Sequence, residues 1–592
     1  MAYELKKEPV DIDVGFEGDA ATGTASSLSD KEKSNSSNYS GPKSILYKMH
    51  NLISLQKDSD LTLSEMFMYN EDLRPVFDIK DRPWNWYNYV FFWIGGAFNL
   101  NTFQIAGTTV SMGLSWYETW IAIWIGYILV SCVYYIAQRP GSHYHISFPV
   151  ACRATFGTFG SIWPVINRVV MAIVWCSTIT WLGGQCVQLV LKSIFGGDLD
   201  TRIHNGIPKS GTTTFQFLSF FIFWLIQLPF IYCKPQTIRH LFTVKTIICP
   251  AAGVAFLVWT IVKAGGIGPV VHQHTTLSSS KHGWAFVMGI MNCFNNFSTL
   301  IVNSSDFTRV AKTPKSSSWS QFIGIPIALS LTSLIGILAA SASTPMYGET
   351  YWSPVDLMNR YVEEGTPGNR AGVFFIAASF ALAQVGTNIA SNTISAGCDM
   401  AALLPQYINI RRGAFLCVMI VLCICPWNFF TSSSNFTTYL SAYAVFLSSI
   451  AGVVSADYTI VRRGYLNVFH LYTNGGSYNY SYNKLGINWR AFAAYICGIL
   501  PNVVGFAGAV GNDVPKGATY IYNVSYFAGY IVAYVSYCVL VYISPVEGMP
   551  VKNFLTEGGW YEDYLDIEVD DFSKAINEPH PNEYSKEGKK FL

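Results

Sequence analysis

Aromatic, amide and hydroxyl side chains recur inside long apolar stretches of this sequence. WCSTITWLGGQ contains Trp175 and Thr178, and ALAQVGTNIASNTISAG repeats Thr387, Asn388 and Asn392 at helical spacing. An indole plane can stack on a flat ring, while amides and hydroxyls form hydrogen bonds with the ring's edge. The pattern favours a site for a heteroaromatic small molecule. The alternatives are ordinary packing of the tryptophan and hydrogen bonds between helices.

Charged side chains are scarce within the apolar stretches, so each one is a candidate for function. Lys245 lies in IRHLFTVKTIICP, where it could act in transport or extend to the membrane interface. Asp306, Asp399 and Asp457 lie near the ends of apolar stretches. A carboxylate there could take up a proton or pair with a nearby arginine.

Composition places the chain in a membrane. Of 592 residues, 51% are hydrophobic and 13% are charged, whereas a soluble protein carries about 25% charged residues. The 38 Lys and Arg nearly balance the 37 Asp and Glu, which argues against a nucleic-acid binder. The sequence contains no nucleophile–base set and no cysteines at metal spacing. We therefore expect no enzyme activity, no cofactor and no metal site.

Apolar stretches define the predicted organisation. About twelve stretches of roughly 18 to 25 residues recur between Trp84 and Tyr542, each long enough to cross a membrane as a helix. Backbone polar groups must be paired in lipid, so we predict an all-α bundle of about twelve spans over residues 84–545. Residues 1–83 form a polar, largely disordered N-terminal tail, and residues 546–592 form a C-terminal tail.

Basic residues predict the orientation of the spans. More Lys and Arg fall in the connections on one side, including Arg411, Arg412, Arg462 and Arg463. Because basic connections stay in the cytoplasm, we expect both termini to be cytoplasmic, with the inverted arrangement as the alternative.

Two spans are predicted to be interrupted. The first reads WIGGAFNLNTFQIAG, and the sixth places Asn292, Asn295 and Asn296 near its middle. Adjacent glycines weaken a helix, and buried amides need partners that lipid does not supply. Broken helices at matching places in two halves are typical of an inverted repeat with a midplane substrate site. Close helix packing is the alternative interpretation.

Longer motifs resemble the fungal branch of the nucleobase-cation-symport family. They include FFWIGGAFNLNTFQIAGTTVSMGLSWYETW, YHISFPVACRATFGTFGSIWPVINR, NFSTLIVNSSDFTRVAK, LLPQYINIRRG and AYAVFLSSIAGVVSADYTIVRRGY. Together they cover nearly the whole membrane region. The resemblance implies a fold of the leucine-transporter type, with a five-plus-five inverted repeat and broken helices one and six.

The resemblance also implies a substrate site. In the structurally known bacterial hydantoin relative, a tryptophan, an aromatic residue and an asparagine hold the ligand, and these positions correspond to Trp175, Phe297 and Asn392. Relatives that carry uracil have a glutamine four residues after the tryptophan, where this sequence has Ile179. This difference favours uridine over uracil. The full predicted substrate set is Trp175, Thr178, Ile179, Lys245, Asn295, Asn296, Phe297, Asn388 and Asn392.

The sodium site of that relative corresponds to Gly95, Phe98, Ala383, Gly386 and Thr387. Gly386 stands where the relative has a serine, so one hydroxyl ligand of a cation is missing. The resemblance therefore favours coupling to protons, with Asp306 and Lys245 as the ionisable candidates.

These patterns predict a plasma-membrane symporter that carries uridine, or a related nucleoside or nucleobase, by alternating access. The alternatives are a uracil or allantoin permease, a thiamine or nicotinamide riboside carrier, and a nutrient-sensing receptor that binds its ligand without transport. The resemblance also implies that ubiquitin-ligase machinery acts on tail lysines, whereas simple solvation is the alternative. These lysines are Lys31, Lys33, Lys43, Lys48 and Lys57.

Overall fold

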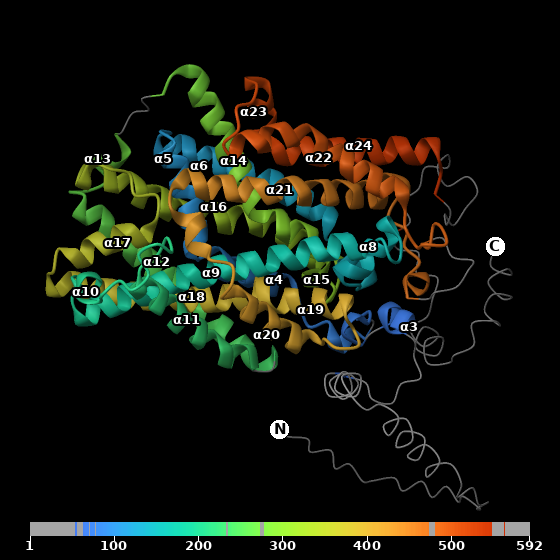
Figure 1. Ribbon diagram of the computed structural model, residues 1–592, viewed down its shortest axis with the longest axis horizontal. Helices are drawn as coiled ribbons and strands as arrows, with labels where there is room; N and C mark the ends of the chain where they lie inside the picture. Colours follow the sequence, from blue (N-terminus) through green and yellow to red (C-terminus); the bar gives the residue numbers. More distant parts are fainter. Residues whose placement is uncertain are drawn as a thin grey trace, which may run out of the picture. The chain divides into compact units, whose positions relative to one another are not determined.

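The computed structural model describes residues 54–55, 63–69, 71–76, 78–232, 235–272, 277–472, 480–546, 560 and 562. All the described helices belong to the unit Asp60–Leu592 (Figure 1). Of the preceding unit, Met1–Ser59, only Ser54 and Leu55 are described. The five tail lysines on which ubiquitin-ligase machinery is expected to act lie outside the described residues.

The described part of the chain contains ten helices or continuous helical runs that are long and apolar enough to cross a membrane. They are α6 (Trp116–Ala137), α9 (Ile162–Phe195), α11 (Thr214–Tyr232), α12 (Pro235–Lys263), α14 (Ser279–Val302), α16 (Pro314–Tyr347), the run α18–η3–α19 (Pro367–Thr387, Asn388–Thr393, Ile394–Leu403), α21 with η5 (Ser433–Ala456, Asp457–Val461), α22 (Trp489–Ala509) and α24 (Ser525–Ile543).

Two further predicted spans contain shorter helices. The first span is divided into α4 (Trp86–Ala97) and α5 (Leu100–Ser111), and the ninth contains α20 (Ile410–Val421), each of 12 residues. The all-helical fold is confirmed, while the count of twelve spans stays a prediction. Short helices complete the described part: α3 (Leu63–Met68), η1 (Glu71–Leu73), η2 (Ile79–Asp81), α7 (Arg139–Tyr144), α8 (Phe148–Phe156), α10 (Leu199–Arg202), α13 (Gly268–Val271), α15 (Ser304–Thr308), α17 (Pro354–Glu363), η4 (Pro426–Phe430), η6 (Phe469–Leu471) and α23 (Lys516–Tyr522).

One side chain stabilises both sides of the break in the first span. Asn99 is the N-cap of α5, and its Oδ1 accepts a hydrogen bond from Thr102 N–H at 3.1 Å. Its Nδ2 donates to the carbonyl of Gly96, in the last turn of α4. Helix ends leave backbone groups without partners. A single amide therefore pairs one carbonyl and one N–H that the break would otherwise leave unpaired in an apolar environment.

The sixth span differs from the prediction. The expected break at Asn292–Asn296 is absent, because α14 runs without interruption from Ser279 to Val302 and gives way to α15 only at Asn303. The asparagines instead form hydrogen bonds with neighbouring helices. Asn292 Nδ2 donates to Thr109 Oγ1 at 3.5 Å, and Asn296 Oδ1 accepts from Asn101 Nδ2 at 2.8 Å. Their amides thus find partners without unwinding the helix.

A π-helical segment, η3, interrupts the eighth span where the sequence suggests only a polar stripe. Segments of this kind are frequent at functional sites. Here it carries Asn388, Ser391 and Asn392.

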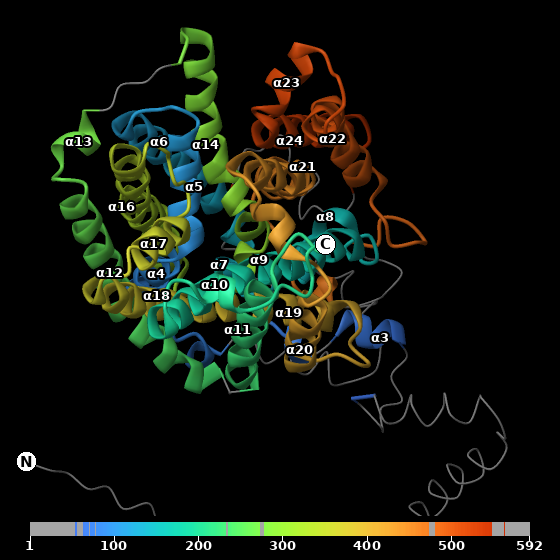
Figure 2. The ribbon, with the colours of Figure 1, turned by 60° about the vertical axis from the view of Figure 1, so that its left-hand side comes forward.

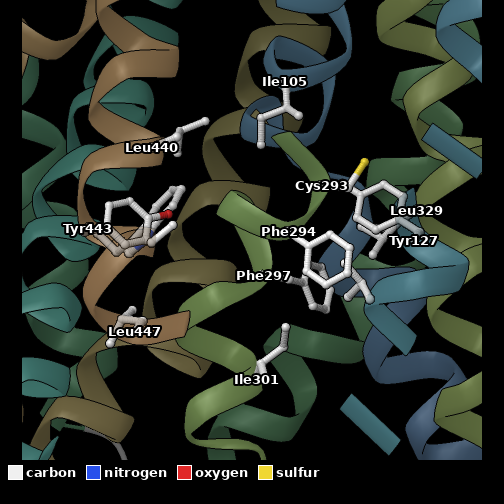
Figure 3. Close-up of a cluster of buried hydrophobic side chains, with 14 of the residues drawn as sticks. Ile105, Tyr127, Cys293, Phe294, Phe297, Ile301, Leu329, Leu440, Tyr443 and Leu447 are labelled. Atoms are coloured by element: carbon white, nitrogen blue, oxygen red, sulfur yellow. The ribbon is translucent and has the colours of Figure 1, made fainter. Parts of the chain in front are cut away.

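The helices pack in three neighbouring groups (Figure 2). α21 packs on α22 and α24, α6 packs on α14 and α16, and α9 packs on α18 and α11. α14 joins the first two groups, since its buried Phe294 and Phe297 lie between α21, which carries Tyr443, and α6, which carries Tyr127 (Figure 3). Tyr443 also donates a hydrogen bond to the carbonyl of Asn295 at 2.6 Å.

Buried carboxylates near the ends of spans pair with arginines. Asp457 Oδ2 lies 2.9 Å from Arg462 Nε, and Asp399 Oδ2 lies 3.7 Å from Arg168 Nη1. All four side chains are almost completely buried. The sequence left two alternatives for these aspartates, proton uptake and pairing with arginine. Asp399 and Asp457 pair with arginine.

Glu562, in the predicted C-terminal tail, binds to α7 and to the end of the span formed by α21 and η5. Its side chain is 2% exposed, and it accepts hydrogen bonds from Arg139 Nε (2.7 Å), Tyr458 OH (2.6 Å) and Trp560 Nε1 (2.8 Å). Burial raises the pKa of Glu562, but the hydrogen bonds from Arg139, Tyr458 and Trp560 and the charge of His143 outweigh it and hold the pKa below its ordinary value of 4.5. The folded state therefore gains stability from this carboxylate above about pH 4.5 and loses it as the pH falls further.

We expect Glu562→Ala to release this segment. Loss of the carboxylate leaves the Arg139 guanidinium without its anion, and breaking a buried pair is unfavourable by about 3–5 kcal/mol. Limited proteolysis should then remove a C-terminal epitope at least about tenfold faster than in the parent protein. Glu349→Ala, at an exposed position, is the control; equal cleavage rates for the parent and both variants would contradict the prediction.

Candidate functional site

A cavity of about 1020 Å³ lies between the broken first span and the third, fifth, sixth and eighth spans. Its lining includes aromatic rings and several amides, a composition typical of small-molecule sites. The predicted residues among its lining are Gly95, Trp175, Ile179, Lys245, Asn296, Phe297, Asp306, Thr387 and Asn392.

Trp175 forms an aromatic wall of the cavity and is only 5% exposed. Two rings of α21 hold it: Tyr443 packs edge-on with a centroid distance of 6.1 Å, and Tyr439 packs at 6.3 Å. Ile179, one helical turn further along α9, lines the same cavity. This wall therefore offers an indole face and an aliphatic side chain, and no amide at position 179.

The amides of the eighth span divide into two roles. Asn392 lines the cavity, and its Nδ2 donates to Asn388 Oδ1 at 2.9 Å. Asn388 lies behind the cavity wall, where its Nδ2 donates to Gln227 Oε1 at 2.6 Å and to Thr180 Oγ1 at 3.1 Å. Asn388 thus orients Asn392 and does not itself line the cavity.

Lys245 lies beside Gly386 and Thr387, two of the residues that correspond to the sodium site of the bacterial relative. Its Nζ donates to Thr387 Oγ1 at 2.6 Å, and Thr387 in turn donates to the carbonyl of Ala383 at 2.9 Å. The lysine side chain passes over Gly386, where an added Cβ would lie 2.8 Å from Lys245 Cδ. The glycine therefore leaves room for the lysine side chain.

Asp306 lies at the end of the cavity that is near the start of α4. Its Oδ1 accepts a hydrogen bond from Phe148 N–H at the beginning of α8 (2.8 Å). Burial raises the pKa of Asp306 above its ordinary value. This effect exceeds the opposing effects of Arg309, the hydrogen bond from Phe148 and Arg168. The lining at this end also includes Pro83, Trp84 and Phe307.

Further along α5, away from the cavity lining, the helix packs closely on the connection between α16 and α17. Gln104 Nε2 donates to Ser353 Oγ at 3.0 Å. Gly107 approaches the same connection so closely that an added Cβ would lie 2.2 Å from the carbonyl oxygen of Trp352. The cavity lining thus includes Asn101 and Thr102 of α5 but neither Gln104 nor Gly107.

Six of the predicted residues do not line the cavity. They are Asn388, Phe98, Thr178, Asn295, Ala383 and Gly386. The sequence reasoning missed several lining residues near the start of α4, namely Trp84, Asn88 and Phe92. Asn88 and Phe92, four residues apart, lie on one face of α4, and this spacing could have shown that face. Trp84 precedes the helix.

Comparison with known proteins shows the family of this chain. Residues 75–529 match the family described as permeases for cytosine/purines, uracil, thiamine and allantoin. The chain belongs to this family. It is 50% identical over 525 residues to the uridine permease of Saccharomyces cerevisiae, covering 88% of this chain and 82% of the relative. The allantoin permease of the same yeast is 48% identical (89% and 84% covered), and its uracil permease is 46% identical (93% and 87% covered).

The fold of the permease is also that of a solved transporter. The inward-facing structure of Mhp1 matches with a TM-score of 0.63 at 20% identity, covering 84% of this chain and 98% of that one. A closed structure of Mhp1, a nucleobase-cation-symport-1 family transporter, matches with a TM-score of 0.60 at 21% identity, covering 84% of this chain and all of that one. This permease is therefore a multi-pass membrane transporter, and its family members are permeases rather than enzymes.

We expect Gly386→Ala to destabilise the permease only while Lys245 is present. The added methyl group would collide with Lys245 Cδ, and overpacking of this kind is unfavourable by about 1–3 kcal/mol. Thermal unfolding of the purified protein should show a lower midpoint for Gly386→Ala. In a Lys245→Ala background the same change should have little further effect.

Gly324→Ala is the matched control, because a Cβ at Gly324 meets no atom within 4 Å. If Gly386→Ala lowers the unfolding midpoint equally in the Lys245→Ala background, the added methyl group does not act by colliding with Lys245, and the prediction is contradicted.

Proposed function

We propose that this permease carries uridine together with a proton by alternating access. The observation that carries the proposal is the cavity wall formed by Trp175 and Ile179, with Asn392 among the same lining residues. The indole can stack on a pyrimidine ring, and the Asn392 amide can form hydrogen bonds with its edge. The relative named uridine permease, at 50% identity, supports the same substrate.

Ile179 favours uridine over uracil. An isoleucine cannot form the hydrogen bonds that an amide at this position would offer to a base, and each unpaired polar group is unfavourable by about 1–3 kcal/mol. A nucleoside can compensate for this loss, because its sugar brings further hydroxyl groups to other walls of the cavity. Uracil and allantoin are the next candidates, since relatives with those names are nearly as similar. Thiamine and nicotinamide riboside are the remaining alternatives.

Lys245 is the group that we propose for proton coupling. The ammonium lies beside Thr387, within the set of residues predicted to bind a cation, and donates to its hydroxyl. An ammonium there can take the place of a metal cation, and its loss of a proton would remove that charge. Asp306 is the second candidate, although its hydrogen bond with the first N–H of α8 also supports a structural role.

The position of the cavity, which is lined by the start of α4 and the first turn of α5, supports the alternating-access mechanism. We propose that the end near the start of α4 faces the cytoplasm, with both termini on that side and the permease in the plasma membrane. Closure at Gln104–Ser353 and Gly107–Trp352 would then separate the substrate site from the outside. Movement of one helix group against another would reverse this access.

We expect cells that lack their own carriers to accumulate labelled uridine when they express this permease. Uptake should fall about 5- to 100-fold in Trp175→Ala, because loss of the indole removes the stacking surface for the base. Uptake of uridine, uracil, allantoin, thiamine and nicotinamide riboside should be measured in parallel, with surface expression of each variant determined. Normal uridine uptake by Trp175→Ala would remove Trp175 from the site.

The same assay distinguishes the transporter from a nutrient-sensing receptor. A receptor would bind its ligand and signal through its tails without net flux. Absence of uptake for every compound, compared with an empty vector, would overturn the proposal of transport in these cells.

We expect Ile179→Gln to shift the preference toward uracil. A glutamine at this position adds a donor and an acceptor to the wall beside Trp175. The ratio of uracil to uridine affinity should rise by about 5- to 100-fold, the range given by one hydrogen bond in a buried site. Ile179→Leu, which changes shape without adding an amide, is the control. An unchanged ratio in Ile179→Gln would contradict the substrate argument.

A further inference from the structure

Asn101 presents an unpaired acceptor in the cavity. Its side chain is 94% buried, since only 6% is exposed, and it lines the cavity in the first turn of α5. Asn101 Nδ2 donates to Asn296 Oδ1 at 2.8 Å, but Oδ1 of Asn101 has no hydrogen-bond partner. A buried acceptor is rarely left unpaired, so such an atom in the wall of a cavity indicates a donor on the ligand.

Neighbouring residues form hydrogen bonds with the amino side of this amide. Asn296 Nδ2 donates to Tyr127 OH at 3.5 Å, and Asn296 Oδ1 faces Asn101. The amino group of Asn101 faces Asn296, and its oxygen is left available. Asn99 caps the break two residues earlier and so sets where α5 begins.

Asn101 lines the same cavity as the proposed base site but comes from a different helix. Trp175 and Asn392 come from α9 and η3, which pack on each other. Asn101 and Asn296 come from α5 and α14, which form another contact in the bundle. If the base lies against Trp175 and Asn392, the part of a nucleoside that extends away from the base is its sugar, and the sugar carries hydroxyl donors.

We infer that Asn101 Oδ1 accepts a hydrogen bond from a sugar hydroxyl of the substrate and thereby selects a nucleoside over a free base. This inference rests on the proposed transport of uridine. It assigns the preference to two residues: Ile179 lowers the affinity for the base, and Asn101 raises the affinity for the sugar.

Asn502 provides a matched control outside the cavity. It is fully buried in α22, its Nδ2 donates to the carbonyl of Ser525 at 3.1 Å, and its Oδ1 is also unpaired. It does not belong to the cavity lining. Asn502→Ala therefore removes a comparable buried amide without removing a group from the substrate site.

The test is inhibition of labelled uridine uptake by uridine, 2′-deoxyuridine, 3′-deoxyuridine, 3-methyluridine and uracil. In the parent permease, at least one deoxynucleoside should bind about 5- to 100-fold more weakly than uridine. Asn101→Ala should weaken uridine by a similar factor and abolish that difference, while the inhibition constant of uracil stays unchanged. Asn502→Ala should retain the parent's discrimination. Inhibition constants do not depend on the amount of protein at the surface.

Other outcomes overturn the inference. Full discrimination between uridine and its deoxy analogues by Asn101→Ala would overturn it. Loss of the discrimination against 3-methyluridine would also overturn it, because that result would assign Oδ1 to the base. Absence of uridine uptake by the parent permease would refute the proposed function, a result separate from either of these.

Variants that do not transport are compared by binding. Purified Asn101→Ala should show less thermal stabilisation by uridine than the parent, and equal stabilisation by uridine and by the deoxynucleosides. If Asn101→Ala does not accumulate, Asn101→Ser is used in the same measurement. A serine hydroxyl is too short to reach both Asn296 and the substrate. Stabilisation of the variant by uridine equal to that of the parent would overturn the inference.

Discussion

Pairing of backbone groups within the membrane is the constraint on which the rest of this structure depends. Lipid offers no hydrogen bonds, so a helix can be interrupted at mid-depth only where side chains or a polar cavity supply partners. At the break between α4 and α5, the amide of Asn99 serves the carbonyl of Gly96 on one side and the N–H of Thr102 on the other. The break, in turn, places Gly95, Asn99 and Asn101 in the lining of the cavity.

Buried amides in this permease serve either the scaffold or the cavity, and their neighbours decide which. Asn388 is enclosed by Gln227 and Thr180, so its hydrogen bonds stay within the protein. Asn392 and Asn101 each give their amino group to a neighbouring asparagine and lie in the cavity lining. A polar network of this kind is rigid, because each amide is oriented by the next.

Similarity alone does not separate the candidate substrates. The relatives named for uridine, allantoin and uracil are 50%, 48% and 46% identical to this chain. Discrimination between such ligands depends on a few groups, because one unpaired polar group changes affinity more than many apolar contacts of similar shape. Ile179 and Asn101 are therefore more informative about the substrate than the overall identity.

The sequence by itself determined the membrane-spanning class, the break near Gly95–Asn101, and part of the cavity lining, including Trp175 and Asn392. These features follow from local patterns: long apolar stretches, adjacent glycines, and aromatic and polar residues at helical spacing. Phe297 was predicted only through the family resemblance. The sequence did not determine that α14 continues through Asn292–Asn296, that η3 is π-helical, or that Lys245 lies over Gly386. Each of these depends on partners far away in the chain, such as Thr109, Asn101 and Thr387, whose positions only the packed helices bring together. An amide in an apolar stretch can find hydrogen-bond partners in an unwound segment of its own helix or on a neighbouring helix. Only the tertiary structure decides between these two arrangements.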